Sequence, residues 1–173
     1  MLKPQDIAVV FKYTLLQDQH PTLEQIAQSL GTTPSNVLLS VRRSVAAKLL
    51  EQPNTRTLKP IRRHILEFLV HGVRYVFYAK RGELTRGMPT AFAAEPLKQH
   101  IVQNTTPPVW ADANGTAYGS SLEPLWKNAP FAAAQDEKLY QLLALVDALR
   151  DGKIRERKLA GEFLEKRLTE DWS

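Results

Sequence analysis

Side chains that can hydrogen-bond to nucleic acid recur at helical spacing after Pro34, in an expected helix that ends at Leu49 and Leu50. On a helix of about 100° per residue, four apolar positions gather on one side: Val37, Leu38, Val41 and Val45. The opposite side carries Ser35, Asn36, Leu39, Ser40 and Arg43. Arg can bond guanine through two hydrogen bonds, Asn can bond adenine, and an apolar tip can contact a thymine methyl. We therefore expect Asn36, Leu39 and Arg43 to read bases, and Thr33, Ser35 and Ser40 to support base or phosphate contacts.

Residues of the kinds used in enzyme active sites do not stand at catalytic spacing. His64 and His71 lie seven residues apart, without the His-Glu-x-x-His pattern of a metalloprotease. Ser120 and Ser121 lack the Gly-x-Ser-x-Gly setting of a nucleophile. Residues 80–90 hold two glycines and three cations, but not the spacing of a phosphate-binding motif, and are expected to form a connecting loop. We expect no enzyme activity, no cofactor and no metal.

The local signals within residues 22–50 predict a pair of short helices. Thr22 followed by Gln25 forms a capping box at a helix start, and Gly31 supplies a left-handed exit at its end. Thr33 can cap the second helix, and Pro34 suits its first turn. Two short helices joined by a tight turn form a helix-turn-helix, whose second helix enters the DNA major groove. A helical hairpin within a purely structural all-α domain is the alternative.

The segments on either side of this pair are expected to complete the same unit. Apolar spacing over residues 2–17 predicts a first helix that packs beneath the pair. Residues 51–58 are compatible with a β-hairpin wing that carries Arg56 near its tip, or with a plain loop. Arg56 would then contact the phosphate backbone, and Arg42 and Lys12 are further candidates for such contacts.

The rest of the chain mixes helical and strand signals. From Pro60 a helix is expected to run to Gly72, and residues 73–78 read as a strand. The Asn-Gly pair at residues 114–115 predicts a hairpin between residues 109–110 and 116–118. Residues 139–149 predict a helix, and a last amphipathic helix follows. These two helices are expected either to form a homodimer interface or to cover the core of their own chain.

Charge and composition are consistent with a partner that carries phosphate. Residues 1–90 hold 13 Lys and Arg against 6 Asp and Glu, whereas residues 91–173 hold 10 against 12. The excess of positive charge thus coincides with the predicted helix-turn-helix. The chain has no cysteine, no apolar run of the ~18 residues that a membrane-spanning helix needs, and no signal-peptide pattern. We expect a cytoplasmic protein without membrane contact.

Residues 22–50 resemble the helix-turn-helix of winged-helix transcriptional regulators of the MarR-like type. Residues 66–77, 85–90 and 142–150 resemble a less characterised subgroup of small bacterial regulators. The resemblance implies a dimeric repressor whose second helix reads the groove, with Asn36, Leu39 and Arg43 at the reading positions. After residue 50 the chain departs from this type, because its wing segment is short and lacks the usual Asp-x-Arg pattern.

Together these observations predict a mainly α fold with small β elements (α+β). Residues 1–72 are expected to form a winged helix-turn-helix domain, and residues 73–173 a mixed β and loop segment with two C-terminal amphipathic helices. The expected function is sequence-specific binding of double-stranded DNA by a homodimeric transcriptional regulator. The alternative is an antitoxin-like or adaptor module that binds a partner protein through residues 91–173.

Overall fold

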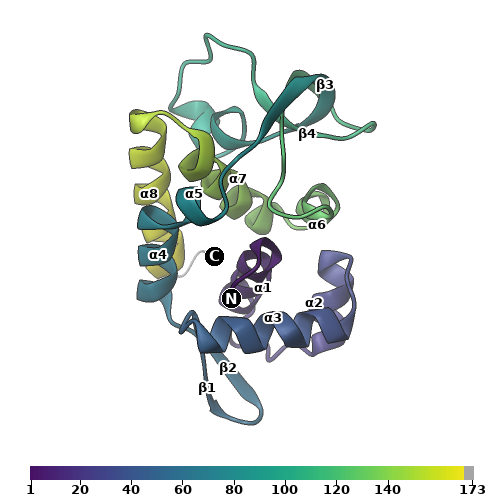
Figure 1. Ribbon diagram of the computed structural model, residues 1–173, viewed down its shortest axis with the longest axis vertical. Helices are drawn as coiled ribbons and strands as arrows, with labels where there is room; N and C mark the ends of the chain where they lie inside the picture. The colour runs from purple at the N-terminus through teal and green to yellow at the C-terminus, as the bar shows by residue number, and fades with distance from the viewer. Residues whose placement is uncertain (170–173) are drawn as a thin grey trace.

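The computed structural model describes residues 1–169 and has a mainly helical α+β fold with small groups of strands (Figure 1). The helices are α1 (Pro4–Leu15), α2 (Leu23–Leu30), α3 (Pro34–Ala46), α4 (Arg62–His71), α5 (Val73–Val76), α6 (Ala129–Gln135), α7 (Glu137–Asp151) and α8 (Ile154–Thr169). The strands are β1 (Leu50–Asn54), β2 (Thr57–Pro60), β3 (Arg81–Pro89), β4 (Pro108–Ala111) and β5 (Ala117–Leu122), with short 3-10 turns η1 (Ala91–Ala93) and η2 (Leu97–Gln99). Within this range, every helix is too short or too polar to serve as a membrane span.

Helix α7 is enclosed by the rest of its own chain. All side chains from Leu142 to Arg150 are buried, and α1, α6, α8 and η1 pack around the helix. A helix that is buried on every side belongs inside a protein core, and this core contains residues from both halves of the chain. From Leu142 onwards α7 therefore has no free face for a second copy, which corrects the expectation of a dimer interface on both C-terminal helices for this part of α7.

An ion pair joins α1 to the beginning of α7. The Nζ atom of Lys12 lies 2.8 Å from Oδ2 of Asp136, whose other carboxylate oxygen accepts a hydrogen bond from the backbone N–H of Leu139. Asp136 thus caps α7 and holds α1 at the same time. Lys12 is buried, so the expectation that it contacts the DNA backbone is wrong. Both predicted segments, residues 1–72 and 73–173, contribute to one hydrophobic core.

Strands β3, β4 and β5 form a small sheet that closes on itself. Strand β3 pairs antiparallel with both β4 and β5, while β4 and β5 pair with each other in parallel. Strands β3 and β4 can approach each other this closely only because residue 87 is a glycine, since a Cβ on Gly87 would lie 2.1 Å from the carbonyl oxygen of Trp110. The expected loop at residues 80–90 is therefore wrong, because this segment forms β3. The expected hairpin around residues 114–115 is also wrong, because β4 and β5 run in the same direction.

Residues 73–78 form the short helix α5 and its exit, so the expected strand is wrong. The N–H of Phe77 donates to the carbonyl of Val73, which closes one helical turn after α4. Val73 is buried, but Tyr75 and Tyr78 are exposed. The β-branched and aromatic residues of this segment thus lack the alternating buried face that a strand requires.

A buried hydrogen-bond network ties α7 to the strands. Oδ2 of Asp147 accepts hydrogen bonds from Oγ1 of Thr90 and Nε1 of Trp110, each at 2.7 Å. Oδ1 of Asp147 accepts from Nη1 of Arg150 at 2.7 Å, and Nε of Arg150 donates to the carbonyl of Phe77. The network fixes the small sheet and the segment before it onto the central helix.

Candidate nucleic-acid interface

The tight turn between α2 and α3 follows the local signals of the sequence. Oγ1 of Thr22 accepts from the N–H of Gln25, and the Gln25 side chain accepts from the N–H of Thr22, so the expected capping box is present. Gly31 has a φ of 64° and ends α2 in the left-handed conformation. Thr33 caps α3 through the N–H of Asn36. These contacts fix the angle at which α3 leaves α2.

The inner face of α3 packs against α1 and α2. Val37 and Val41 are buried as expected, and Ser40 and Ser44 are buried as well, whereas Leu38, which was expected on the same side, is exposed. Ser40 has no exposed surface, and its Oγ accepts hydrogen bonds from Gln5 of α1 and from Arg43. The expectation that Ser40 lies on the outer face is therefore wrong.

Arg43 is held by an acidic residue of α1 instead of pointing outwards. Its Nε and Nη2 donate to the two carboxylate oxygens of Asp6, at 2.8 and 2.7 Å. The Asp6 side chain has no exposed surface, and only 18 % of the Arg43 side chain is exposed. The hydrogen bonds from Arg43 to Asp6 raise the pKa of Arg43. In this geometry the guanidinium positions α3 against α1, and the expected base-reading orientation of Arg43 is corrected.

The outward face of α3 is formed by a different set of side chains. Ser35, Asn36, Leu39 and Arg42 are all exposed, with 47 % of the Leu39 surface accessible. The side-chain N–H of Asn36 donates to Oγ1 of Thr32 at 3.1 Å. This bond does not use the amide oxygen of Asn36. Arg42, expected only as a phosphate contact, is thus the guanidinium of α3 that faces solvent.

The hairpin β1–β2 lies beside the C-terminal end of α3. Its strands pair antiparallel, with Leu50 opposite Pro60 and Asn54 opposite Thr57, so the hairpin alternative is confirmed over the plain loop. Oδ1 of Asn54 accepts from the N–H of Arg56, which shapes the turn and puts Arg56 at the exposed tip. Figure 1 shows α3 and the hairpin along one edge of the molecule.

Further cations surround α3 and the hairpin. Lys48, between α3 and β1, and Lys59 of β2 are exposed. One exposed carboxylate, that of Glu51 on β1, lies among them. Sequence reasoning did not single out these two lysines, because neither belongs to a motif and only the structure shows that both are exposed, on the hairpin and on its connection to α3. This edge of the molecule therefore has a positive balance of charge.

A small cleft of about 270 Å³ adjoins the N-terminal half of α3. Its lining includes Asn36, Leu39 and Arg43 of α3. Lys3, just before α1, and Trp126 of the second half of the chain also line it. The side chain of Asn128 donates to the carbonyl of Gly31 at 2.6 Å. The second half of the chain thus braces the turn before α3 and borders its outward face.

Neither a protein-family model, nor a curated protein, nor a solved structure matches the chain. The resemblance to winged-helix regulators therefore stays an interpretation of the sequence.

The other residues with catalytic potential remain separate. Nδ1 of His64 lies 2.8 Å from the carbonyl oxygen of Lys48, and His71 is exposed at the end of α4. Across residues 1–169, no three His, Asp or Glu side chains are grouped so that they could hold a metal ion. Ser120 and Ser121 lie on β5, at its pairing edge with β4. The interface on α3 and the hairpin is the better-supported candidate.

Proposed function

We propose that the chain binds duplex DNA through α3 and the β1–β2 hairpin, as a winged helix-turn-helix regulator of transcription. The observation that carries this proposal is the exposed face of α3, where Ser35, Asn36, Leu39 and Arg42 project beside a hairpin tipped by Arg56. Short polar side chains let a helix enter the major groove, and a neighbouring hairpin can follow the backbone.

The charge of this edge supports contact with phosphates. Arg42, Lys48, Arg56 and Lys59 are exposed together on α3, the hairpin and their connection. Cations that neutralise phosphates release condensed counterions, so binding weakens steeply as salt rises. Glu51 reduces this charge locally but does not balance it.

Each exposed residue has a distinct role in the proposal. Asn36 reads an adenine edge, Leu39 contacts a thymine methyl, and Ser35 supports either base or phosphate. Arg42 and Arg56 contact phosphates, and the exposed Thr33 sits at the N-terminus of α3, where backbone N–H groups favour an anion.

Arg43 acts indirectly in the same proposal. If its guanidinium turned outwards, the buried carboxylate of Asp6 would lose its partner, which is strongly unfavourable. Arg43 therefore keeps α3 at a fixed position on α1 and does not reach a base.

Fluorescence anisotropy with a labelled duplex tests the proposal. The duplex is taken from the DNA upstream of the chain's own coding region, and a shuffled duplex and two salt concentrations are included. We expect tighter binding to the upstream duplex, a loss of affinity at higher salt, and a loss of about tenfold for Arg42→Ala. Lys98→Ala removes an exposed cation on η2, away from α3, and serves as the matched control. Equal affinity of the two variants, or binding that salt does not weaken, would refute the proposal.

A further inference from the structure

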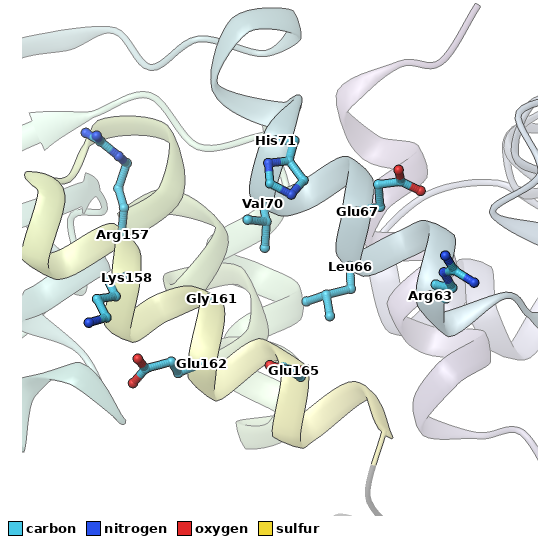
Figure 2. Close-up of a pocket in the computed structure, with 10 residues that line it drawn as sticks. All are labelled: Arg63, Leu66, Glu67, Val70, His71, Arg157, Lys158, Gly161, Glu162 and Glu165. Carbon is cyan, nitrogen blue, oxygen red and sulfur yellow. The ribbon is translucent and has the colours of Figure 1, made fainter.

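Helix α8 presents an outward stripe of charged residues around a glycine. Arg157 and Lys158 precede Gly161 on this stripe, and Glu162 and Glu165 follow it. Together with α4, the stripe borders a groove of about 520 Å³. Figure 2 shows Leu66 and Val70 of α4 pointing into this groove, opposite Gly161. The groove thus has an apolar centre and charged borders.

Gly161 is not required by the packing of its own chain. A Cβ added there would meet only Cγ2 of Val70, at 3.7 Å, which is an ordinary contact. By contrast, a Cβ on Gly87 or Gly119 would lie 2.1 Å from a backbone oxygen. Glycine inside a helix destabilises it relative to alanine. A glycine that the monomer does not need is therefore best explained by another molecule that approaches α8 closely at this point.

The stripe is positively charged before Gly161 and negatively charged after it. Arg157 precedes Gly161 by four residues and Glu165 follows it by four, with Lys158 and Glu162 between them. Within residues 1–169, none of these four side chains takes part in an ion pair, and Arg157 donates one hydrogen bond, to the carbonyl of Gly152 at 2.9 Å. Two identical stripes laid antiparallel would place cations on carboxylates. Laid parallel, they would place like charges together, which is unfavourable at an interface.

We propose that a second copy of this chain docks on the α4–α8 face, with the two α8 helices antiparallel and crossing at Gly161. Arg157 and Lys158 of each copy then face Glu162 and Glu165 of the other, and the apolar side chains of the groove are covered. Because both copies use the same patch, a two-fold axis relates them and the assembly is a closed dimer.

This arrangement has a consequence for DNA that rests on the proposed function. Arg62, which follows β2, donates a hydrogen bond to the carbonyl of Leu168, so the C-terminal end of α8 lies on the side of the hairpin. Figure 1 shows α8 running along one side of the molecule towards the edge that carries α3 and the hairpin. An antiparallel dimer therefore places its two DNA-binding edges at opposite ends. Such a dimer joins two duplexes and does not read two half-sites on one duplex.

The dimer can be tested in the absence of DNA with variants of the full chain in which charges of the stripe are reversed. Sedimentation velocity is measured over a hundredfold range of protein concentration for the wild type, Arg157→Glu, Glu165→Arg and the double variant. We expect a reversible dimer that each single exchange weakens by at least about tenfold, since the two-fold axis repeats every repulsion. The double variant restores the pairs with reversed sign and should recover to within about threefold of the wild type.

Lys127→Glu makes the same change of charge on an exposed loop residue outside the groove, and should leave the dimer intact. Gly161→Leu should abolish the dimer while circular dichroism and the melting temperature show a folded chain. A wild type that stays monomeric throughout, or a dimer that tolerates Gly161→Leu, overturns the proposal.

A bridging assay separates this inference from the proposed function. One duplex is fixed to beads, and capture of a second, labelled duplex is measured with the wild type and with Gly161→Leu. We expect capture by the wild type only, while both proteins bind a single duplex. A dimer that binds no DNA contradicts the proposed function alone, and a dimer that binds two sites on one duplex contradicts the antiparallel arrangement.

Discussion

The guanidinium of Arg43 and the carboxylate of Asp6 form a two-point contact, with N–O distances of 2.8 and 2.7 Å, inside the junction of α3 with α1. Asp6 also accepts a hydrogen bond from the backbone N–H of Lys3 at 2.8 Å, so the same carboxylate caps α1. One buried acid thereby sets the start of α1 and the position of α3. The orientation of the candidate DNA-binding helix depends on this contact.

Arg43→Ala should destabilise the fold as well as DNA binding. The substitution leaves a fully buried carboxylate without its cation, and loss of one partner of a buried pair costs about 3–5 kcal/mol. Urea unfolding followed by circular dichroism measures the change in the free energy of unfolding. Arg42→Ala is the matched control, because Arg42 is exposed, and should stay within about 0.5 kcal/mol of the wild type. Equal stability of the two variants would contradict the role given to Asp6.

The placement of Ser40 and Arg43 shows why a helical wheel was insufficient for this site. The wheel correctly put Val37 and Val41 inside, because one apolar stripe marks the buried face of a helix. It could not reveal that α1 also covers the part of α3 beside the apolar stripe, where the buried carboxylate of Asp6 pairs with Arg43. Partners from distant segments decide such positions, and the sequence offers no spacing that links residues 6 and 43.

The helices were predicted more reliably than the strands. Thr22, Gly31 and Thr33 act through contacts within a few residues, so their effects could be read from the sequence. Strand β3 is mostly exposed and lacks the alternating pattern of a half-buried strand. Its partners are fixed by close approaches at glycines such as Gly87, which depend on segments far along the chain.

Asn36→Ala and Arg56→Ala should affect DNA binding in different ways. Loss of the Asn36 amide should cost about 1–3 kcal/mol on the preferred duplex and relax the preference at one base pair. Loss of Arg56 should weaken binding to all duplexes about equally and reduce the slope of log affinity against log salt by about one. Selection from a randomised duplex library, together with a salt titration, measures both effects. Asn114→Ala, an exposed Asn before β5, should change neither.

Tyr140 should make stability fall at alkaline pH. Burial, with the nearby charge of Glu137, raises the pKa of Tyr140 to about 12, from 10.0. The folded state therefore holds the phenol proton when the unfolded state has already lost it. This contribution to stability is fully present below pH 10 and is lost as pH rises towards 12.

Unfolding curves of the wild type and Tyr140→Phe, measured across this interval, isolate the effect. The phenylalanine variant also lacks the hydrogen bond to the carbonyl of Pro89, so the comparison uses the change with pH and not the absolute stability. The loss between pH 10 and 12 should be smaller in Tyr140→Phe. Tyr118→Phe, which alters an exposed tyrosine, should follow the wild type. Parallel curves for Tyr140→Phe and the wild type would refute the assignment.

Alanine at Gly161 and at Gly87 should have opposite effects on folding. At Gly161 the added methyl group meets open space and a single ordinary contact, so better helix propensity should stabilise the monomer by about 0.5–1 kcal/mol. At Gly87 the same methyl group would lie 2.1 Å from the Trp110 carbonyl oxygen, so β3 and β4 must separate and stability must fall. Unfolding measured at concentrations below the dimer range removes the influence of self-association. If Gly161→Ala destabilises the monomer, then its own packing requires the glycine, and the argument for a close external contact at α8 fails.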